Sequence, residues 1–124
     1  MMGTQIVAID DNTTNLKLLE KLLEEKYNIV CFRNPVTALK YIKNNRADLI
    51  LSDLMMPEMN GIELLKNLNS DNIHVPLVMI SAYDKKQYID DAYFNGALKY
   101  IVKPINPDEL FEVIDNTLTL SPNG

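Results

Sequence analysis

The sequence predicts an α/β fold, in which a parallel five-stranded sheet lies between two layers of helices to make one three-layer domain. Five short apolar runs, each too brief to form a helix, alternate along the chain with five segments of helical spacing. Parallel strands need a long crossover connection, and the intervening helical segments supply one each time. With 124 residues, 47% of them hydrophobic, the chain has the size of one domain with a sizeable core. We therefore expect one domain over residues 1–124, with residues 121–124 as a tail or the stub of a linker.

The first strand is predicted at residues 6–9, where four apolar residues stop at Asp10 and Asp11. Asn12 follows and can cap a helix through its side-chain oxygen. Leucines then recur at the spacing of one helix face, and they are Leu16, Leu19, Leu22 and Leu23. The segment is therefore predicted to be a βα unit whose strand ends in acids.

The second strand is predicted at residues 28–32, and it contains Cys31, the single cysteine of the chain. A lone cysteine can form neither an internal disulfide nor a metal cluster, so we interpret it as a small core residue. Asn34 and Pro35 open the following helix, because proline suits the first helical position. This strand ends in Arg33 and not in an acid.

The third apolar run, residues 49–52, stops at Asp53, and Pro57 prevents simple continuation of the strand. A strand covered on both faces is a costly place for an acid unless the acid sits just past the apolar part, at a cleft. We therefore place Asp53 at the carboxyl end of a buried strand. A turn over residues 57–61 leads into the next helix.

The fourth run, residues 77–80, ends at Ser81. A helix is predicted from about residue 84 to 95, and it closes on Gly96, because glycine is the residue type that most often follows a helix end. The only histidine, His74, precedes this strand and is interpreted as a solvated loop residue.

The fifth run, residues 98–102, ends at Lys103 and Pro104. The final helix has the clearest start, with Asn106 as its cap and Pro107 at the first helical position. Each of the five apolar runs is thus followed by a helix with a recognisable beginning or end.

The overall charge argues against two classes of partner. A net charge of −5 and a pI near 4.7 oppose the approach of nucleic-acid phosphates and of anionic lipids, so direct nucleic-acid or membrane binding is not expected. No charged-then-apolar leader opens the chain, and no run approaches the ~20 apolar residues of a membrane span. The cytoplasm is the expected location.

Four of the five predicted strands end in a chemically capable residue. In an open parallel sheet, ligands bind beyond the carboxyl ends of the strands, at the point where the strand order reverses. The second strand ends in no acid, which suits a position away from that point, as in the order 2-1-3-4-5. The other strand ends then border one cleft at the carboxyl edge of the sheet, which we call the mouth. It brings together five candidate site residues: Asp10, Asp11, Asp53, Ser81 and Lys103.

Three carboxylates in one mouth repel one another, which raises their pKa values or recruits a cation. Hard oxygen ligands on a partly open loop favour Mg²⁺. A carboxylate can attack phosphorus and form an acyl phosphate when a metal and cations neutralise the phosphoryl oxygens. We therefore hypothesise that Asp53 attacks in line, with Mg²⁺ held by Asp11 and Asp53 and with Asp10 acting largely through water. Lys103 and Ser81 bind the transferred group in this hypothesis.

The motifs at these four strand ends resemble those of the receiver domain of two-component response regulators. The resemblance runs from about residue 5 to 118, and the motifs occur in the family's order. They are Asp10-Asp11-Asn12, Asp53 with Met56-Pro57-Glu58-Met59-Asn60-Gly61, Ser81-Ala82, and Lys103-Pro104. The resemblance implies a (βα)5 flavodoxin-like sandwich and a phosphoacceptor signalling switch.

The resemblance also implies roles for single residues. Asp53 would accept a phosphoryl group from a phosphohistidine of a sensor histidine kinase or a histidine phosphotransfer protein. The domain would not be an enzyme beyond catalysing its own phosphorylation and dephosphorylation. Met55 would lend its backbone carbonyl to Mg²⁺. Tyr100, three residues before Lys103, would be an aromatic switch that moves inward as Ser81 is drawn toward the phosphoryl group, with a plain core aromatic as the alternative.

Two further expectations concern the surroundings of the site. The Lys103–Pro104 peptide bond is expected to be cis, as the family commonly has it. Met55 and Tyr83, each two residues beyond a site residue, lie where side chains modulate dephosphorylation in the family. Two bulky groups there would screen the acyl phosphate from water and lengthen its life.

We expect the output to be read on the surface of the fourth helix, fifth strand and fifth helix. A phosphoryl group coupled to the switch residues would bias two conformations of this surface. Tyr88, Tyr93 and Lys99 are the candidates for contacts with an output partner or in a homodimer. The chain is expected to be either a single-domain regulator or a receiver from a larger protein.

Three competing functions can be separated from this one. An aspartate-nucleophile phosphatase shares the acyl-phosphate chemistry but usually has a second acid two residues after the nucleophile, where this chain has Met55. A flavin or nucleotide module needs a Gly/Ser-rich phosphate loop after the first strand, where Asp10 and Asp11 would repel phosphate. A phosphorylation-independent interaction module with a vestigial site would neither bind Mg²⁺ nor accept phosphate.

A group of methionines is interpreted as packing and turn residues, namely Met55, Met56 and Met59.

Overall fold

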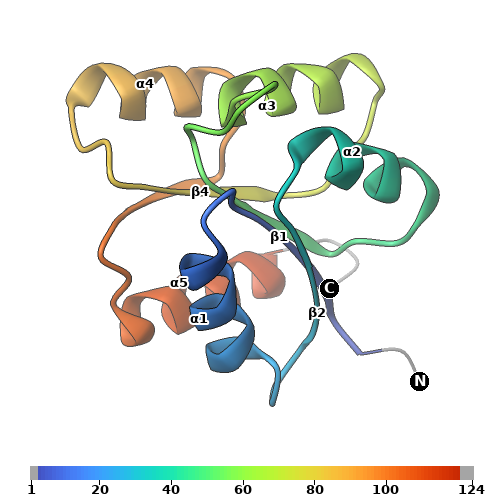
Figure 1. Cartoon of the computed structure of the whole chain (residues 1–124), viewed down its shortest axis with the longest axis vertical. Helices are drawn as coiled ribbons and strands as arrows, with labels where there is room; N and C mark the ends of the chain where they lie inside the picture. Colours follow the sequence, from blue (N-terminus) through green and yellow to red (C-terminus); the bar gives the residue numbers. More distant parts are fainter. Residues whose placement is uncertain (1–2, 121–124) are drawn as a thin grey trace.

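The computed structural model describes residues 3–120 and has one parallel sheet between two layers of helices (Figure 1). The strands are β1 (Gln5–Ile9), β2 (Asn28–Phe32), β3 (Leu49–Ser52), β4 (Leu77–Ser81) and β5 (Lys99–Val102). They pair in parallel in the order β2-β1-β3-β4-β5. The predicted fold class and strand order are confirmed, whereas the expected tail at residues 121–124 lies outside the described residues.

Five helices cover the two faces of the sheet. They are α1 (Thr13–Leu23), α2 (Pro35–Asn44), α3 (Gly61–Ser70), α4 (Lys86–Phe94) and α5 (Pro107–Leu120). Helices α1 and α5 lie on one face, and α2, α3 and α4 lie on the other (Figure 1). None of the helices within residues 3–120 is long and apolar enough to cross a membrane.

Each helix layer packs against the sheet in its own hydrophobic core. Because successive side chains of a strand point to opposite faces, β1 contributes to both cores. Val7 and Ile9 pack with α2 and α3, whereas Ile6 and Ala8 pack with α1 and α5. The central strands β3 and β4 are buried along their whole length. Cys31, on the edge strand β2, was expected to be a small core residue; it packs against the α1–α5 core but is only partly buried.

Asparagine side chains begin four of the five helices. As predicted, Asn12, Asn34 and Asn106 each accept a backbone N–H of the first turn that follows, at 3.0, 2.8 and 3.1 Å. The sequence prediction missed the fourth cap, in which Asn60 and Glu63 form a reciprocal capping box at the start of α3. Such caps satisfy N–H groups that have no partner inside the helix, and each is typically worth about 1 kcal/mol.

Helix α4 is the most weakly held of the first four helices. It begins at Lys86, later than the predicted residue 84, and the preceding residue Lys85 makes no capping bond with its side chain. Ala92 is its one buried residue. The neighbouring strand β5 also begins one residue later than predicted, at Lys99. Without a capping side chain, the start of α4 is set by tertiary packing and not by a local signal.

Gly61 joins α3 to the strand end that carries Asp53. Its N–H donates to the carbonyl oxygen of Leu54 at 2.7 Å. A Cβ atom on Gly61 would lie 2.7 Å from the backbone oxygen of Asp53 and 2.6 Å from Sδ of Met79. Glycine is therefore required at this position, because the helix start approaches the backbone of the site too closely for a side chain.

We predict that Gly61→Ala lowers the free energy of unfolding by about 1–3 kcal/mol, because the added methyl group overpacks against a backbone atom that has little freedom to move. Helix propensity alone predicts the opposite sign, since alanine is the better helix former by about 1 kcal/mol. Urea denaturation measures the difference. Lys66→Ala, on the exposed face of α3, is the control and should stay within about 0.5 kcal/mol of the parent. A Gly61→Ala protein as stable as the parent would contradict this account of the helix start.

Candidate functional site

Three carboxylates meet at the carboxyl ends of two neighbouring strands. Asp10 and Asp11 follow β1, and Asp53 follows β3; one carboxylate oxygen from each lies within 4.8 Å of the others. Strands β1 and β3 pair with Ile9 opposite Ser52, so their ends lie at the same height in the sheet. Asp10 is buried and Asp53 is half-buried, whereas Asp11 is the most exposed of the three. The structure thus brings together the three acids that the sequence placed at one mouth.

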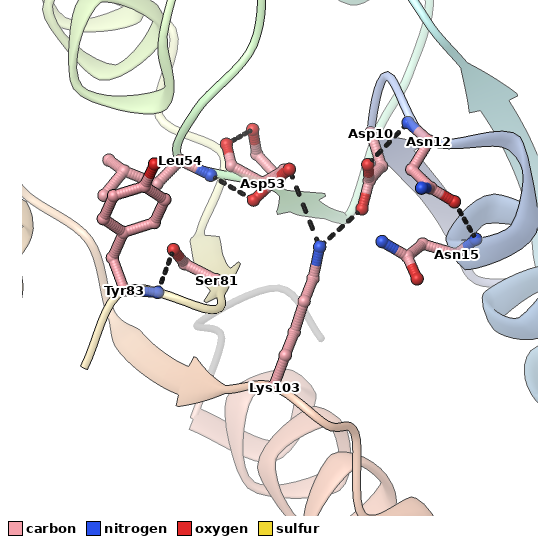
Figure 2. Close-up of polar contacts among 9 residues, drawn as sticks. Asp10, Asn12, Asn15, Asp53, Leu54, Ser81, Tyr83 and Lys103 are labelled. Atoms are coloured by element: carbon pink, nitrogen blue, oxygen red, sulfur yellow. Dashed lines mark hydrogen bonds and ion pairs between the residues drawn. The ribbon is translucent and has the colours of Figure 1, made fainter.

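Lys103 reaches into this cluster from the end of β5 (Figure 2). Its Nζ lies 2.9 Å from Oδ2 of Asp10 and 3.6 Å from Oδ2 of Asp53. Its backbone N–H donates to the carbonyl oxygen of Ser81 at 2.8 Å, which fixes the lysine beside β4. The Lys103–Pro104 peptide bond is cis, the isomer that was expected. The lysine therefore supplies one positive charge to a group of three negative ones.

Backbone N–H groups hold the two inner acids in place. Oδ1 of Asp10 accepts the N–H of Asn12 at 2.8 Å, and Oδ1 of Asp53 accepts the N–H of Leu54 at 2.8 Å. The N–H of Asp53 donates to the carbonyl oxygen of Ile9 at 2.9 Å, which ties the end of β3 to β1. These bonds leave Oδ2 of each acid facing Lys103 (Figure 2).

Burial and the crowding of carboxylates in this arrangement make Asp53 harder to ionise. Burial raises the pKa of Asp53 from its ordinary value of 3.8 to about 6, and the neighbouring carboxylates of Asp10 and Asp11 add to the rise. The Lys103 ammonium and the N–H of Leu54 act in the opposite direction but do not cancel it. At neutral pH the site holds more negative charge than its own lysine neutralises.

This set of oxygen atoms fits a small divalent cation. Carboxylates are hard ligands, and Mg²⁺ in proteins takes one or two of them, with waters completing its coordination. Asp10, Asp11 and Asp53 form the one group of metal-ligating side chains found within residues 3–120. Met55, the expected source of a carbonyl ligand, lies two residues after Asp53 in the β3–α3 loop and is exposed. The donors and the excess negative charge both favour a cation at this position.

Ser81 lies on the other side of Asp53 from Asp10, because β3 runs between β1 and β4. The residue is fully buried, and its Oγ accepts the N–H of Tyr83 at 3.0 Å. Figure 2 shows Ser81 and Asp10 on either side of Lys103. Asp53 is thus flanked by a hydroxyl group, an ammonium group and a second carboxylate.

Tyr100 is tied to the segment that follows Ser81. Its hydroxyl donates to the carbonyl oxygen of Tyr83 at 2.5 Å, and its backbone N–H donates to the hydroxyl of Tyr93 at 3.1 Å. Burial raises the pKa of Tyr100. The half-buried phenol therefore lies against the β4–α4 loop, two residues beyond the serine of the site.

The remaining predicted residues lie at the rim and on the α4–β5 surface. Tyr83 is 42% exposed and meets Tyr88 edge to face, with ring centroids 5.1 Å apart. Tyr93 and Lys99 are exposed, and Tyr88 is half-buried. Met55 is exposed beside the mouth. Their functional roles stay predictions.

Residues with predicted structural roles fall where those roles require. His74 is exposed in the connection before β4. Met56 is buried in the core with α2 and α3, and Met59 packs partly buried against the same core. Met56 and Met59 are packing residues, as predicted, whereas Met55, the third methionine of that prediction, is exposed in the β3–α3 loop.

One polar side chain near the site was missed by the sequence reasoning. Asn15 is half-buried on the first turn of α1, and its side chain points toward Lys103 in Figure 2. Its N–H is held by Oδ1 of Asn12 at 3.0 Å. The available signal was its place in the first turn of a helix that starts directly after the acids, since that turn faces the mouth.

Comparison with known protein families agrees with this geometry. The family model described as response regulator receiver domain matches residues 6–115. The polar-differentiation response regulator DivK of Brucella anthropi is 32% identical over 120 residues, covering 94% of this chain and 98% of DivK. The two-component response regulator ARR10 of Arabidopsis thaliana is 32% identical over 112 residues, covering 88% of this chain and 20% of ARR10. The chain therefore spans about a fifth of the length of that plant relative and nearly the whole of DivK.

Solved structures give the same result. The receiver domain of the Francisella response regulator 1452 superposes with a TM-score of 0.89 at 28% identity, covering 94% of this chain and 97% of that one. A CheY-like receiver domain protein from Methanospirillum hungatei JF-1 gives a TM-score of 0.87 at 30% identity, with 94% of both chains covered. The matched family extends over most of the chain and includes every strand end that forms the site. The chain belongs to the response regulator receiver domain family.

Proposed function

We propose that this receiver domain is a signalling switch in which Asp53 accepts a phosphoryl group in a Mg²⁺-dependent reaction. The observation that carries the proposal is the convergence of Asp10, Asp11 and Lys103 on Asp53, at the edge of the sheet where ligands of such folds bind. The phosphoryl donor would be a phosphohistidine of a sensor histidine kinase or of a histidine phosphotransfer protein. The domain would act on its own side chain only and so would not be an enzyme with a separate substrate.

The carboxylates of Asp10, Asp11 and Asp53, with the backbone carbonyl of Met55, would hold the Mg²⁺ ion. When bound, the ion supplies positive charge that offsets the charge on the phosphoryl oxygens. The excess negative charge of the cluster supports this assignment, because Lys103 alone does not balance three carboxylates.

In the proposed reaction, a carboxylate oxygen of Asp53 attacks the phosphorus atom in line with the leaving group. The new oxygen–phosphorus bond forms as the phosphorus–nitrogen bond to the donor imidazole breaks, and the electron pair of that bond stays on the imidazole nitrogen. Lys103 Nζ and Ser81 Oγ lie on the two sides of Asp53 from which they can bind phosphoryl oxygens (Figure 2). Asp53 must be ionised to attack, and a bound cation would favour the ionised form against the burial that raises its pKa.

The proposed switch couples the phosphoryl group to α4 through Ser81 and Tyr100. If Ser81 turns toward the phosphoryl group, it gives up its bond to the N–H of Tyr83, the residue whose carbonyl holds the Tyr100 hydroxyl. A movement of the Ser81 side chain would therefore act on Tyr100 through the backbone of Tyr83. The surface of α4, β5 and α5, with Tyr88, Tyr93 and Lys99, would then meet an output partner or a second copy of the chain.

We predict that a small-molecule phosphoryl donor such as phosphoramidate, with Mg²⁺, adds one phosphoryl group to the parent protein and none to Asp53→Asn. Chelation of the metal should abolish the addition, because the phosphoryl charge is then not neutralised. Intact-mass spectrometry measures the product. Asp84→Asn, which removes an exposed acid outside the cluster, is the control and should be labelled like the parent. Equal labelling of Asp53→Asn and the parent would refute the assignment of Asp53.

We predict that Asp53→Asn raises the free energy of unfolding at pH 7 without divalent cations, by about 1–2 kcal/mol after allowing for solvent screening. The folded-state pKa of Asp53, about 6, exceeds its ordinary value of 3.8, so ionised Asp53 destabilises the folded state. This penalty is complete above pH 6 and disappears as the pH falls toward 4.

Urea denaturation between pH 4 and pH 7 tests this dependence, and saturating Mg²⁺ should stabilise the parent more than Asp53→Asn because the ion binds the carboxylate. Asp84→Asn should show no comparable gain at any pH. A stability gain for Asp53→Asn that is the same at pH 4 and pH 7 would contradict the electrostatic explanation.

We predict that Tyr83→Ala and Met55→Asn each shorten the lifetime of the phosphorylated protein. Both side chains are exposed beside the mouth, and smaller or more polar groups would admit water to the acyl phosphate. The decay of the phosphorylated mass after removal of the donor measures the lifetime. A half-life unchanged by both substitutions would remove the screening role.

A further inference from the structure

The β3–α3 loop, which follows Asp53, is anchored at both ends but not at its apex. At one end Asp53 is bonded to β1, and at the other the N–H of Gly61 donates to the carbonyl oxygen of Leu54 at 2.7 Å. Leu54 and Met56 are buried, whereas the apex around residues 57–58 is exposed. One backbone bond closes the apex locally, from the N–H of Met59 to the carbonyl oxygen of Pro57 at 2.8 Å, so the position of the apex relative to the rest of the molecule depends on contacts outside the loop.

Glu58, at the apex, has an unusual backbone conformation. Its φ angle is +70°, in the left-handed region that residues with a side chain rarely adopt. Its carboxylate Oε1 accepts a hydrogen bond of 2.8 Å from Nδ2 of Asn34, in the β2–α2 turn. An unfavourable backbone conformation persists only where the surroundings hold it. Here the turn bond from the N–H of Met59 to the carbonyl oxygen of Pro57 spans Glu58, and the bond from Asn34 ties its side chain to the β2–α2 turn.

The orientation of the Asn34 amide is determined by its other bonds. Oδ1 accepts the N–H groups of Val36 and Thr37 at 2.8 and 3.1 Å, as the cap of α2. Nδ2 is then the atom free to donate to Glu58. Helices α2 and α3 lie on the same face of the sheet (Figure 1), and this one side chain joins the start of α2 to the loop before α3.

We propose that Asn34 and Glu58 are positioning residues for the divalent cation, because they hold the loop that presents the backbone carbonyl of Met55. Mg²⁺ requires short, nearly octahedral coordination, so a displacement of one carbonyl by a fraction of an ångström weakens binding. Met55 lies three residues before Glu58 in the same loop. The inference rests on the proposed function, since it concerns the same metal site.

The test compares Mg²⁺ affinity among variants that break the bond from either side. Asn34→Ser keeps a capping oxygen for α2 but has no amide to donate, and Glu58→Ala removes the acceptor. Each should raise the Kd for Mg²⁺ about two- to five-fold, measured by titration of amide chemical shifts in NMR. The double variant should bind Mg²⁺ no more weakly than the single variant with the lower affinity, because both substitutions remove the same hydrogen bond. Full additivity of the two losses would overturn the proposal.

Glu58→Gln separates the hydrogen bond from the charge, because glutamine keeps an acceptor oxygen and carries no charge. It should bind Mg²⁺ with the parental affinity. If Glu58→Gln weakens binding as much as Glu58→Ala, then Glu58 acts by long-range attraction and the proposal is wrong.

Glu58→Gly separates positioning from general stability. Glycine accepts the left-handed conformation at no steric cost, so the resistance to urea should be unchanged or higher while the affinity for Mg²⁺ falls. A purely structural role would move both quantities in the same direction.

A parent protein that binds no Mg²⁺ would defeat the proposed function itself, whereas normal binding by the parent and by every variant would defeat only this inference.

Discussion

The crowding of buried negative charge at one edge of the sheet is the constraint on which the rest of the structure depends. Asp10 is only 2% exposed, and the pKa of its neighbour Asp53 is raised to about 6 by burial and by that carboxylate. Lys103 relieves part of the repulsion but leaves the cluster negative. Apolar side chains at these strand ends would stabilise the fold more. The arrangement is therefore explained by the ligand that it prepares for, and not by folding alone.

Several structural features serve to keep this edge in register. The backbone bond from Asp53 to β1, the close approach of Gly61, and the capping box that starts with Asn60 all fix the segment that follows β3. The opposite side of the site is held differently. Helix α4 has one buried residue and no capping side chain, so its attachment depends on specific contacts such as those of Tyr100. The segment after β3, which carries Asp53, is thus rigidly held, whereas α4 on the opposite side of the site is weakly held and can move when the charge at Asp53 changes.

Most of the fold was predictable because its signals are local. The apolar runs, the prolines after Asn34 and Asn106, and the acids after the strands are all visible within a few residues of sequence. The capping box of Asn60 was missed because Asn60 lies inside the predicted turn over residues 57–61, so it was not considered as a helix cap. The start of α4 was placed too early because no local cap marks it. The bond between Asn34 and Glu58 joins two loops 24 positions apart, which no local pattern encodes.

By itself, the sequence determined the fold class, the strand order and the residue types at the mouth, because strand-terminal residues of a parallel sheet necessarily collect at one edge. The tertiary structure alone decided how these residues meet. Lys103 contacts Asp10 across 93 positions of chain, and the raised pKa of Asp53 depends on burial and on distances between charges. Burial and electrostatic interactions depend on separation in space, and separation in space is settled only when all the strands and helices have packed.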